Sequence, residues 1–398
     1  MRITIIDGFR GFFLLFMMIV HANMPLRVLS GKLNHHYFGW VEDAQGFVFI
    51  SGLVVALVYG RIGMRKGEAA MSLGIRKRVR TIYSHQVGLV LILFATALTT
   101  QYFLGQTSPF LRPYVESPLT FLAGSLLLVT GSANMGILPM YILFMLATPM
   151  VLRLFHRGYL LTPIAFSLIL WLAAQSGIGE HMVNRAEEML AAHGMGIRLG
   201  LFFNPLGWQL LFFSGALFGY LLSVDKLDLS ILDGRDALGA FLICLLAFVG
   251  LGIYDRLAFG SWLPPETLSA IMGPIDRGNL SILYVLAFAV DLFLFVWLIR
   301  AAPTCGIPLF EAAGRFVTWI FTRPALVFLG QHSLHVFSAH ILIFYALDLL
   351  LVFYRPGVVM ANLIVLLSPL PLYAVAWAHK RQVLSDKRAK EATGASPA

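Results

Sequence analysis

Apolar segments about as long as a bilayer is thick are the feature of this sequence that most constrains its fold. A helix needs about 20 apolar residues to cross a bilayer, whereas a transmembrane β-strand needs only about ten of alternating polarity. The segments therefore predict an all-α, polytopic integral membrane protein with about ten transmembrane helices. The expected spans are residues 5–24, 43–60, 82–104, 137–155, 159–175, 204–222, 237–255, 281–300, 325–350 and 358–378.

The composition agrees with this fold class. Of the 398 residues, 59% are hydrophobic and only 12% are charged, about half the charged fraction of a soluble protein. The net charge of +9 would suggest nucleic acid as a partner of a soluble chain, but here the excess of Lys and Arg in cytoplasmic loops explains it. Cys244 and Cys305 indicate no disulfide framework, and no cleavable signal peptide is evident.

An eleventh apolar run, residues 118–131, is short and lies between Pro118 and Gly131. With ten spans and a cytoplasmic N-terminus, most Lys and Arg residues fall on the cytoplasmic side, as the positive-inside rule requires. Counting 118–131 as a span would move the RLFHRG stretch and the basic tail outside. We therefore expect 118–131 to be re-entrant or interfacial and both termini to be cytoplasmic.

The domain organisation that follows is simple. We expect residues 1–380 to form a single membrane domain and residues 381–398 to form a basic, disordered cytoplasmic tail. The longer external segments are 25–42, 105–136, 176–203 and 256–280, and within the third of them residues 180–196 predict an amphipathic helix at the outer interface.

The first span carries ionisable side chains. Arg10 and His21 are eleven residues apart, which in a helix places them on one face and roughly 16 Å apart. Asp7 lies one turn before Arg10, in position to pair with it. Ionisable groups in a membrane helix are costly and usually face a protein interior, a cavity or a partner. A lone membrane histidine is more often structural than catalytic, so the interpretation of His21 depends on its neighbours.

The second span supplies such neighbours, because its outer end should lie near the outer end of the first. Glu42 or Asp43 could hold one nitrogen of His21 and leave the other as a base. Asp43 is the better candidate, since it is closer to the apolar run.

Basic residues at the cytoplasmic side are candidates for binding a polyphosphorylated ligand. Arg10 would act together with the IRKRVR stretch that precedes the third span, through Arg76, Arg78 or Arg80. The alternative role for each of them is to fix the topology against anionic lipid.

The sixth span begins with polar residues suited to hydroxyl-rich molecules. Asn204 and Gln209 lie in its outer part, and Trp208 is either a member of the aromatic belt or a stacking surface for a substrate. In the ninth span, the stretch FLGQHSLHVFSAH contains three histidines. It has no nearby Cys, Asp or Glu to complete a metal set, so we expect structural hydrogen bonding there and no metal site.

The stretch IDGFRG with Arg10-x10-His21 resembles the opening of the membrane acyltransferase-3 superfamily. Three further stretches that resemble this superfamily follow in the order expected for it: FVFISG, IRKRVRTIY and LVFLGQHSLHVFSAH. LPMYILFMLATPMVLRL and FNPLGWQLLFFSGALFG resemble the OpgC branch, which adds succinyl groups to osmoregulated periplasmic glucans. The stretch at the third span reads RTIYSHQ, whereas the broader superfamily often has Pro after the Arg. This difference favours the OpgC branch over general sugar O-acetylases. The resemblance extends to about residue 378.

The resemblance implies an O-acyltransferase of the bacterial inner membrane that uses cytosolic acyl-CoA, most of all succinyl-CoA, as co-substrate. No permanently bound cofactor is expected, and the partners are the lipid bilayer and a periplasmic glucan, not nucleic acid. The resemblance carries Arg10 and His21 over as the essential pair. At roughly 16 Å apart, they cannot both contact one thioester. Arg10, with Arg76, Arg78 or Arg80, would hold the phosphate end of CoA.

His21 would then act as general base on the glucan hydroxyl, or alternatively become transiently acylated itself. Two other functions are open: O-acetylation of another cell-envelope polysaccharide, and transport of a carbohydrate or lipid-linked precursor. Transporters often have two related halves with matched broken helices, and the sequence has no such repeat.

Overall fold

The computed structural model describes residues 3–33, 35, 41–132, 134–195, 198–259 and 262–392. These residues form α-helices, short 3-10 turns and loops, with no β-strand among them, so the all-α prediction is confirmed. The chain divides into two compact units. The single membrane domain expected over residues 1–380 stays a prediction. The terminal unit combines residues 1–34 with 318–398, and the central unit comprises residues 35–317.

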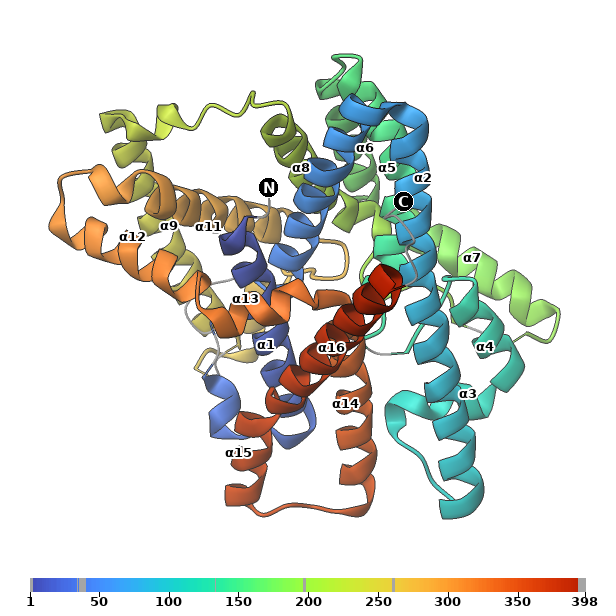
Figure 1. Ribbon diagram of the computed structural model, residues 1–398. Helices are drawn as coiled ribbons and strands as arrows, with labels where there is room; N and C mark the ends of the chain where they lie inside the picture. The colour runs from blue at the N-terminus through green and yellow to red at the C-terminus, as the bar shows by residue number, and fades with distance from the viewer. Residues whose placement is uncertain are drawn as a thin grey trace. The chain divides into compact units, whose positions relative to one another are not determined.

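The terminal unit is built from helices at both ends of the chain (Figure 1). The predicted span 325–350 is divided at His332, and a turn at residues 368–369 divides the predicted span 358–378. Asn362 accepts a hydrogen bond from the backbone N–H of Ser30 at 2.9 Å. The elements of the terminal unit are α1 (Thr4–Leu26), η1 (Leu29–Lys32), α13 (Pro324–Gln331), α14 (Ser333–Phe353), α15 (Val358–Leu367) and α16 (Leu370–Ala392).

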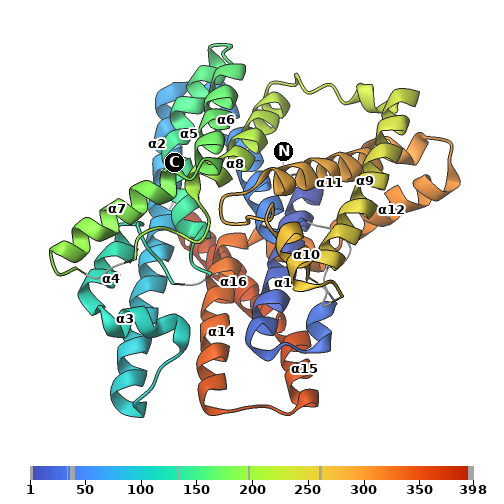
Figure 2. The ribbon, with the colours of Figure 1, turned by 180° about the vertical axis from the view of Figure 1, so that it is seen from behind.

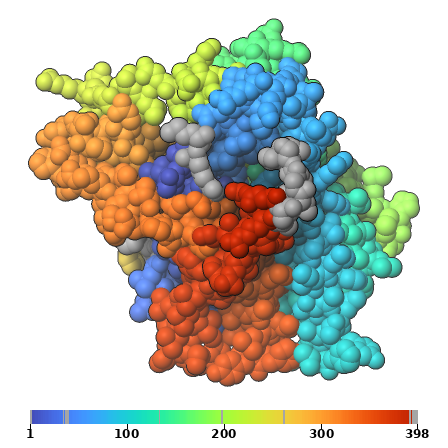
Figure 3. Space-filling view, viewed as in Figure 1, coloured from blue at the N-terminus to red at the C-terminus, as the bar shows by residue number. Residues whose placement is uncertain are grey.

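The last helix, α16, continues beyond the predicted span. Residues 381–392 are therefore helical, where we expected a disordered tail, and residues 393–398 lie outside the described residues. Residues 381–388 are exposed, and the red end of α16 lies on the surface in Figure 3. Their Lys and Arg side chains make this end basic, as predicted.

Helix α1 packs against the α13 region through glycines. A Cβ added to Gly8 would overlap the carbonyl oxygen of Phe321, and a Cβ added to Gly11 would overlap that of Leu326. On the opposite side, a Cβ on Gly330 would overlap the carbonyl oxygen of Asp7. Small residues allow membrane helices to approach to backbone contact, where van der Waals packing is strongest. The two segments therefore meet backbone to backbone.

The central unit contains the remaining helices (Figures 1 and 2). Its longer members are α2 (Asp43–Leu104), α5 (Ile137–His156), α6 (Leu161–Gln175), α7 (Ile178–Ala192), α8 (Pro205–Ser223), α9 (Arg235–Phe259), α11 (Ile282–Arg300) and α12 (Pro308–Phe321), the last of which ends in the terminal unit. The short elements are η3 (Pro109–Leu111), α3 (Arg112–Glu116), α4 (Pro118–Leu126), η4 (Ser230–Asp233), α10 (Pro265–Met272) and η5 (Ala302–Thr304).

Helix α2 has 62 residues and contains two predicted spans, 43–60 and 82–104. The residues between them are mostly good helix formers such as Arg, Lys, Ala and Met, which explains why this connection is helical rather than a loop. The helix is broken at Gly67, whose φ of 85° and ψ of 165° suit glycine alone. Figure 1 shows the two arms of α2 running in different directions from this break.

Among the described residues, eight helical segments are long and apolar enough to cross a membrane, or nine if α6 and α7 form one bent span. The number is below the predicted ten because α2 combines two spans and because α6 has only 15 residues. At about 22 Å, α6 alone is shorter than the hydrocarbon core. The protein is therefore polytopic, as predicted.

The two short helices expected outside the spans are present. Helix α4 has nine residues, about 13 Å, and the Tyr83 hydroxyl of α2 donates to the carbonyl oxygen of Leu126 at its end. Helix α7 bends by 61° away from α6 (Figure 2), and each of its residues is at least partly exposed. Whether 118–131 is re-entrant or interfacial stays a prediction.

The glycine contact between α1 and α13 leads to a stability prediction. We expect Gly11→Ala to lower the free energy of unfolding by about 1–3 kcal/mol, because the new methyl group forces two backbones apart. Gly250→Ala on α9 is the matched control, since apart from the adjoining backbone of its own helix none of the described atoms lies within 4 Å of a Cβ there. Thermal unfolding of both variants in detergent tests this, and equal stability of the two would contradict it.

Candidate active site

Arg10 is held by the first residue of α14. Its Nη2 donates a hydrogen bond to the Ser333 hydroxyl at 2.5 Å. Ser333 is buried, and it begins α14 because the helix is interrupted at His332. The contact holds the Arg10 guanidinium beside the start of α14.

His21 is held by a second histidine. Its Nδ1 lies 2.5 Å from Nε2 of His340, and the two rings stack with their centroids 4.8 Å apart and 23° between their planes. His340 is fully buried, with 0% of its surface exposed, while His21 is partly exposed. A buried ring therefore orients a more accessible one.

The direction of the hydrogen bonds follows from the third member of this chain. Nδ1 of His340 lies 3.3 Å from the carbonyl oxygen of Phe337, which can only accept. A neutral His340 therefore carries its proton on Nδ1 and presents the lone pair of Nε2 to His21. His21 must donate through Nδ1, which puts its own lone pair on Nε2. This tautomer is the one a general base needs.

The two contacts together align α14 with α1. Ser333 and His340 are seven residues apart, so they lie on one face of α14, as Arg10 and His21 lie on one face of α1. Both pairs run in the same chain direction, so the helices are parallel. Structural hydrogen bonding was expected in the stretch that contains Ser333 and His340, and both residues make such bonds, but Arg10 and His21 were not predicted as their partners.

Asp43, the predicted partner of His21, lies at the start of α2 in the central unit. It is buried, and its carboxylate is 3.6 Å from Nε2 of His35. Glu42 precedes it as the cap of α2, with the Gln45 side chain accepting from the Glu42 backbone at 3.0 Å. Because His21 belongs to the other unit, its pairing with Asp43 stays a prediction.

The three arginines predicted to bind phosphate lie on the second arm of α2. Arg76 and Arg80 are exposed, and Arg78 is partly buried, within electrostatic range of Tyr59 on the first arm. Their joint action with Arg10 stays a prediction, since Arg10 belongs to the terminal unit.

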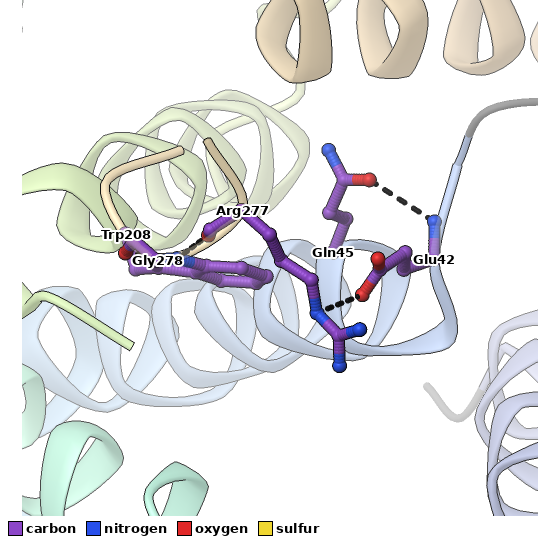
Figure 4. A network of polar contacts seen from close by, with 5 residues as sticks. All are labelled: Glu42, Gln45, Trp208, Arg277 and Gly278. Atoms are coloured by element: carbon purple, nitrogen blue, oxygen red, sulfur yellow. Dashed lines mark hydrogen bonds and ion pairs between the residues drawn. The ribbon is translucent and has the colours of Figure 1, made fainter. Parts of the chain in front are cut away.

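The residues predicted to bind a hydroxyl-rich substrate contact other parts of the protein. Asn204 caps α8 and donates to the Asn279 side chain at 2.7 Å. Trp208 is 0% exposed, and its indole N–H donates to the backbone carbonyls of Arg277 and Gly278 (Figure 4). Gln209 is buried and bonded to Ser167. In this conformation Trp208 offers no face to a sugar ring, and the substrate role of the three stays a prediction.

The other histidines of the ninth predicted span contact α16. Nδ1 of His332 lies 2.7 Å from Nδ1 of His379, and the His335 ring stacks on His379 at 3.6 Å. The described residues include no group of three or more His, Cys, Asp or Glu that could hold a metal ion.

Comparison with known proteins gives a family match over nearly the whole chain. The family described as OpgC protein matches residues 2–383. No curated protein and no solved structure matches this chain significantly.

The hydrogen-bond chain predicts the tautomers of both histidines. We expect the proton of His340, and that of neutral His21, on Nδ1, because the Phe337 carbonyl can only accept. Side-chain ¹⁵N NMR of histidine-labelled protein, assigned with His340→Gln, tests this. A proton on Nε2 of His340 would reverse the direction of the chain and contradict the assignment.

Proposed function

Because this chain belongs to the OpgC family, we propose that it transfers an acyl group, most of all succinyl, from cytosolic acyl-CoA to hydroxyl groups of a periplasmic glucan. Family membership implies an acyltransferase and favours a carbohydrate acceptor. The observation that carries the proposal is the hydrogen-bond chain from Phe337 through His340 to His21. It prepares Nε2 of His21 to accept a proton.

The reaction requires one proton to move twice. Nε2 of His21 takes the proton from the sugar hydroxyl as its oxygen attacks the thioester carbonyl. The carbon–sulfur bond then breaks, and the CoA thiolate leaves as a thiol with the proton from His21. His340 is a positioning residue: it fixes the ring of His21 through the hydrogen bond at Nδ1. Since the proton returns to the leaving group, His21 is neutral again at the end.

Arg10 serves the other end of the donor. Its guanidinium, held by Ser333, can bind a CoA phosphate as a planar, permanently charged donor, and Arg76, Arg78 and Arg80 would add to this charge. Arg10 and His21 are roughly 16 Å apart along α1, so the flexible pantetheine arm of CoA would join the two. This arrangement supports a path from a cytoplasmic donor to an external acceptor, in an inner-membrane protein with both termini cytoplasmic.

The proposal predicts different defects for the two residues of α1. With purified protein and glucan, we expect His21→Ala to lower the rate of CoA release by at least about 10²-fold, the usual contribution of a general base. Arg10→Ala should mainly raise the KM for acyl-CoA. His193 and Arg355, which are both exposed, supply the control alanine variants.

Succinyl-, acetyl- and malonyl-CoA should be compared in the same assay. No CoA release with any of them would reject the enzyme and favour a transporter. If Arg10→Ala leaves the KM for acyl-CoA unchanged while His21→Ala raises it, the two roles are reversed.

His340 provides a separate test of positioning. We expect His340→Leu to lower kcat roughly 100-fold with little change in the KM for acyl-CoA, because His21 loses the acceptor that orients it. His340→Gln should recover much of the activity, since its side-chain oxygen can accept from Nδ1 of His21. Equal activity of the Leu and Gln variants would show that the hydrogen bond has no part in catalysis.

A further inference from the structure

The α10–α11 loop, residues 273–281, is the meeting point of three segments predicted to lie outside the membrane. It belongs to segment 256–280, and it contacts Glu42 of segment 25–42 and Glu180 of segment 176–203. All of these residues lie in the central unit. An acceptor on the external side would therefore meet this loop.

Helix side chains hold the loop through its backbone. Trp208 of α8 donates to the carbonyl oxygens of Arg277 and Gly278 at 3.1 Å. From α6, Gln175 donates to the carbonyl oxygen of Asn279 and Trp171 to that of Leu280, both at 2.8 Å. Trp171 and Trp208 are buried, so these donors fix the side chains that the loop presents.

Arg277 is the centre of what the loop presents. Its side chain is 44% exposed, and its Nε lies 2.7 Å from a carboxylate oxygen of Glu42. Its guanidinium lies over the Phe202 ring, 5.1 Å from the ring centre, and Phe202 is 59% exposed. Figure 4 shows the Arg277 side chain extended toward Glu42. A planar cation is thus fixed between a carboxylate and an open aromatic ring.

Amide and carboxylate groups continue this surface. Nδ2 of Asn279 donates to Asp276 at 2.7 Å and to Glu180 at 3.0 Å, while its oxygen accepts from Asn204. Glu42 pairs with Arg277, and Asp276 and Glu180 bond the neighbouring Asn279, so this surface carries three carboxylates and one arginine. That balance disfavours an anionic ligand such as phosphate. Fixed hydrogen-bonding groups beside an exposed ring instead suit a neutral, hydroxyl-rich molecule, whose apolar face can stack on the ring.

We propose that Phe202, Arg277, Glu42 and Asn279 form a binding subsite for the neutral saccharide acceptor. The inference rests on the proposed function for the identity of the acceptor. It assigns Asn204 and Trp208 a different part from the one expected from the sequence: they position the loop from inside the protein. The main sugar contacts are then made by the exposed Phe202 and Arg277, with the partly buried Glu42 and Asn279 beside them.

Direct binding tests this subsite without any acyl transfer. A short neutral gluco-oligosaccharide is titrated by calorimetry into full-length protein in lipid nanodiscs. We expect Phe202→Ala and Arg277→Ala each to weaken binding roughly tenfold, the size of one lost contact of this kind. Phe166→Ala is the control, since Phe166 is 61% exposed on α6. Unchanged binding in both loop variants would overturn the subsite.

Arg277→Lys separates ligand binding from folding. The ammonium group keeps the ion pair with Glu42 but loses the planar fork, so the melting temperature should stay near that of the wild type while binding weakens. Wild-type affinity in Arg277→Lys would exclude the guanidinium as a sugar contact. Tighter binding of a phosphorylated oligosaccharide than of the neutral one would overturn the neutral assignment.

The subsite and the proposed function fail in different ways. Saccharide binding by wild-type protein that releases no CoA from any acyl-CoA would reject the acyl transfer and support the subsite. Glucan-dependent CoA release, with an unchanged KM for the acceptor in Phe202→Ala and Arg277→Ala, would reject the subsite and support the transfer.

Discussion

Backbone contact between α1 and α13 is the interaction on which the candidate active site depends. Gly8, Gly11 and Gly330 remove the side chains that would hold these segments apart. Without an aqueous solvent, membrane helices gain little from apolar burial, so close packing must supply the attraction. This contact sets the distance from α1 to the α13–α14 pair. The short hydrogen bonds of Arg10 and His21 to α14 can form only at that distance.

The partner of His21 also fits its environment. A buried carboxylate would bring a second charge into a medium that solvates charge poorly, whereas a neutral histidine orients the ring without that cost. The arrangement differs from the Ser-His-Asp type, in which an acidic group stabilises the imidazolium. Here the neutral His340 orients the ring of His21 through a hydrogen bond and adds no charge to the site.

The sequence predicted features that depend on one segment at a time. The length of the apolar segments predicted the helical spans, and a spacing of eleven residues placed Arg10 and His21 on one face of α1. It could not show which distant helix lies beside α1, so the hydrogen bonding expected around Ser333 and His340 was not assigned to Arg10 and His21. The 62-residue α2 contains two of the predicted spans. The charged residues between them were interpreted as a loop, although the same residue types favour a helix. The burial of Trp208 could not be predicted either, since an aromatic ring in the outer part of a span can be exposed or buried.

The way in which the α10–α11 loop is anchored has a consequence for divergence within the family. The side chains of Trp171, Gln175 and Trp208 donate hydrogen bonds to backbone carbonyl oxygens of the loop. Every amino acid residue has such a carbonyl group. Most side chains on this loop can therefore be replaced without loosening its attachment to the helices. Evolution, or an engineer, could alter what the loop recognises while the helical framework and its chemistry remain untouched. Relatives that act on different acceptors would then differ most at the loop's outward side chains and least at the two tryptophans and the glutamine that bind its backbone.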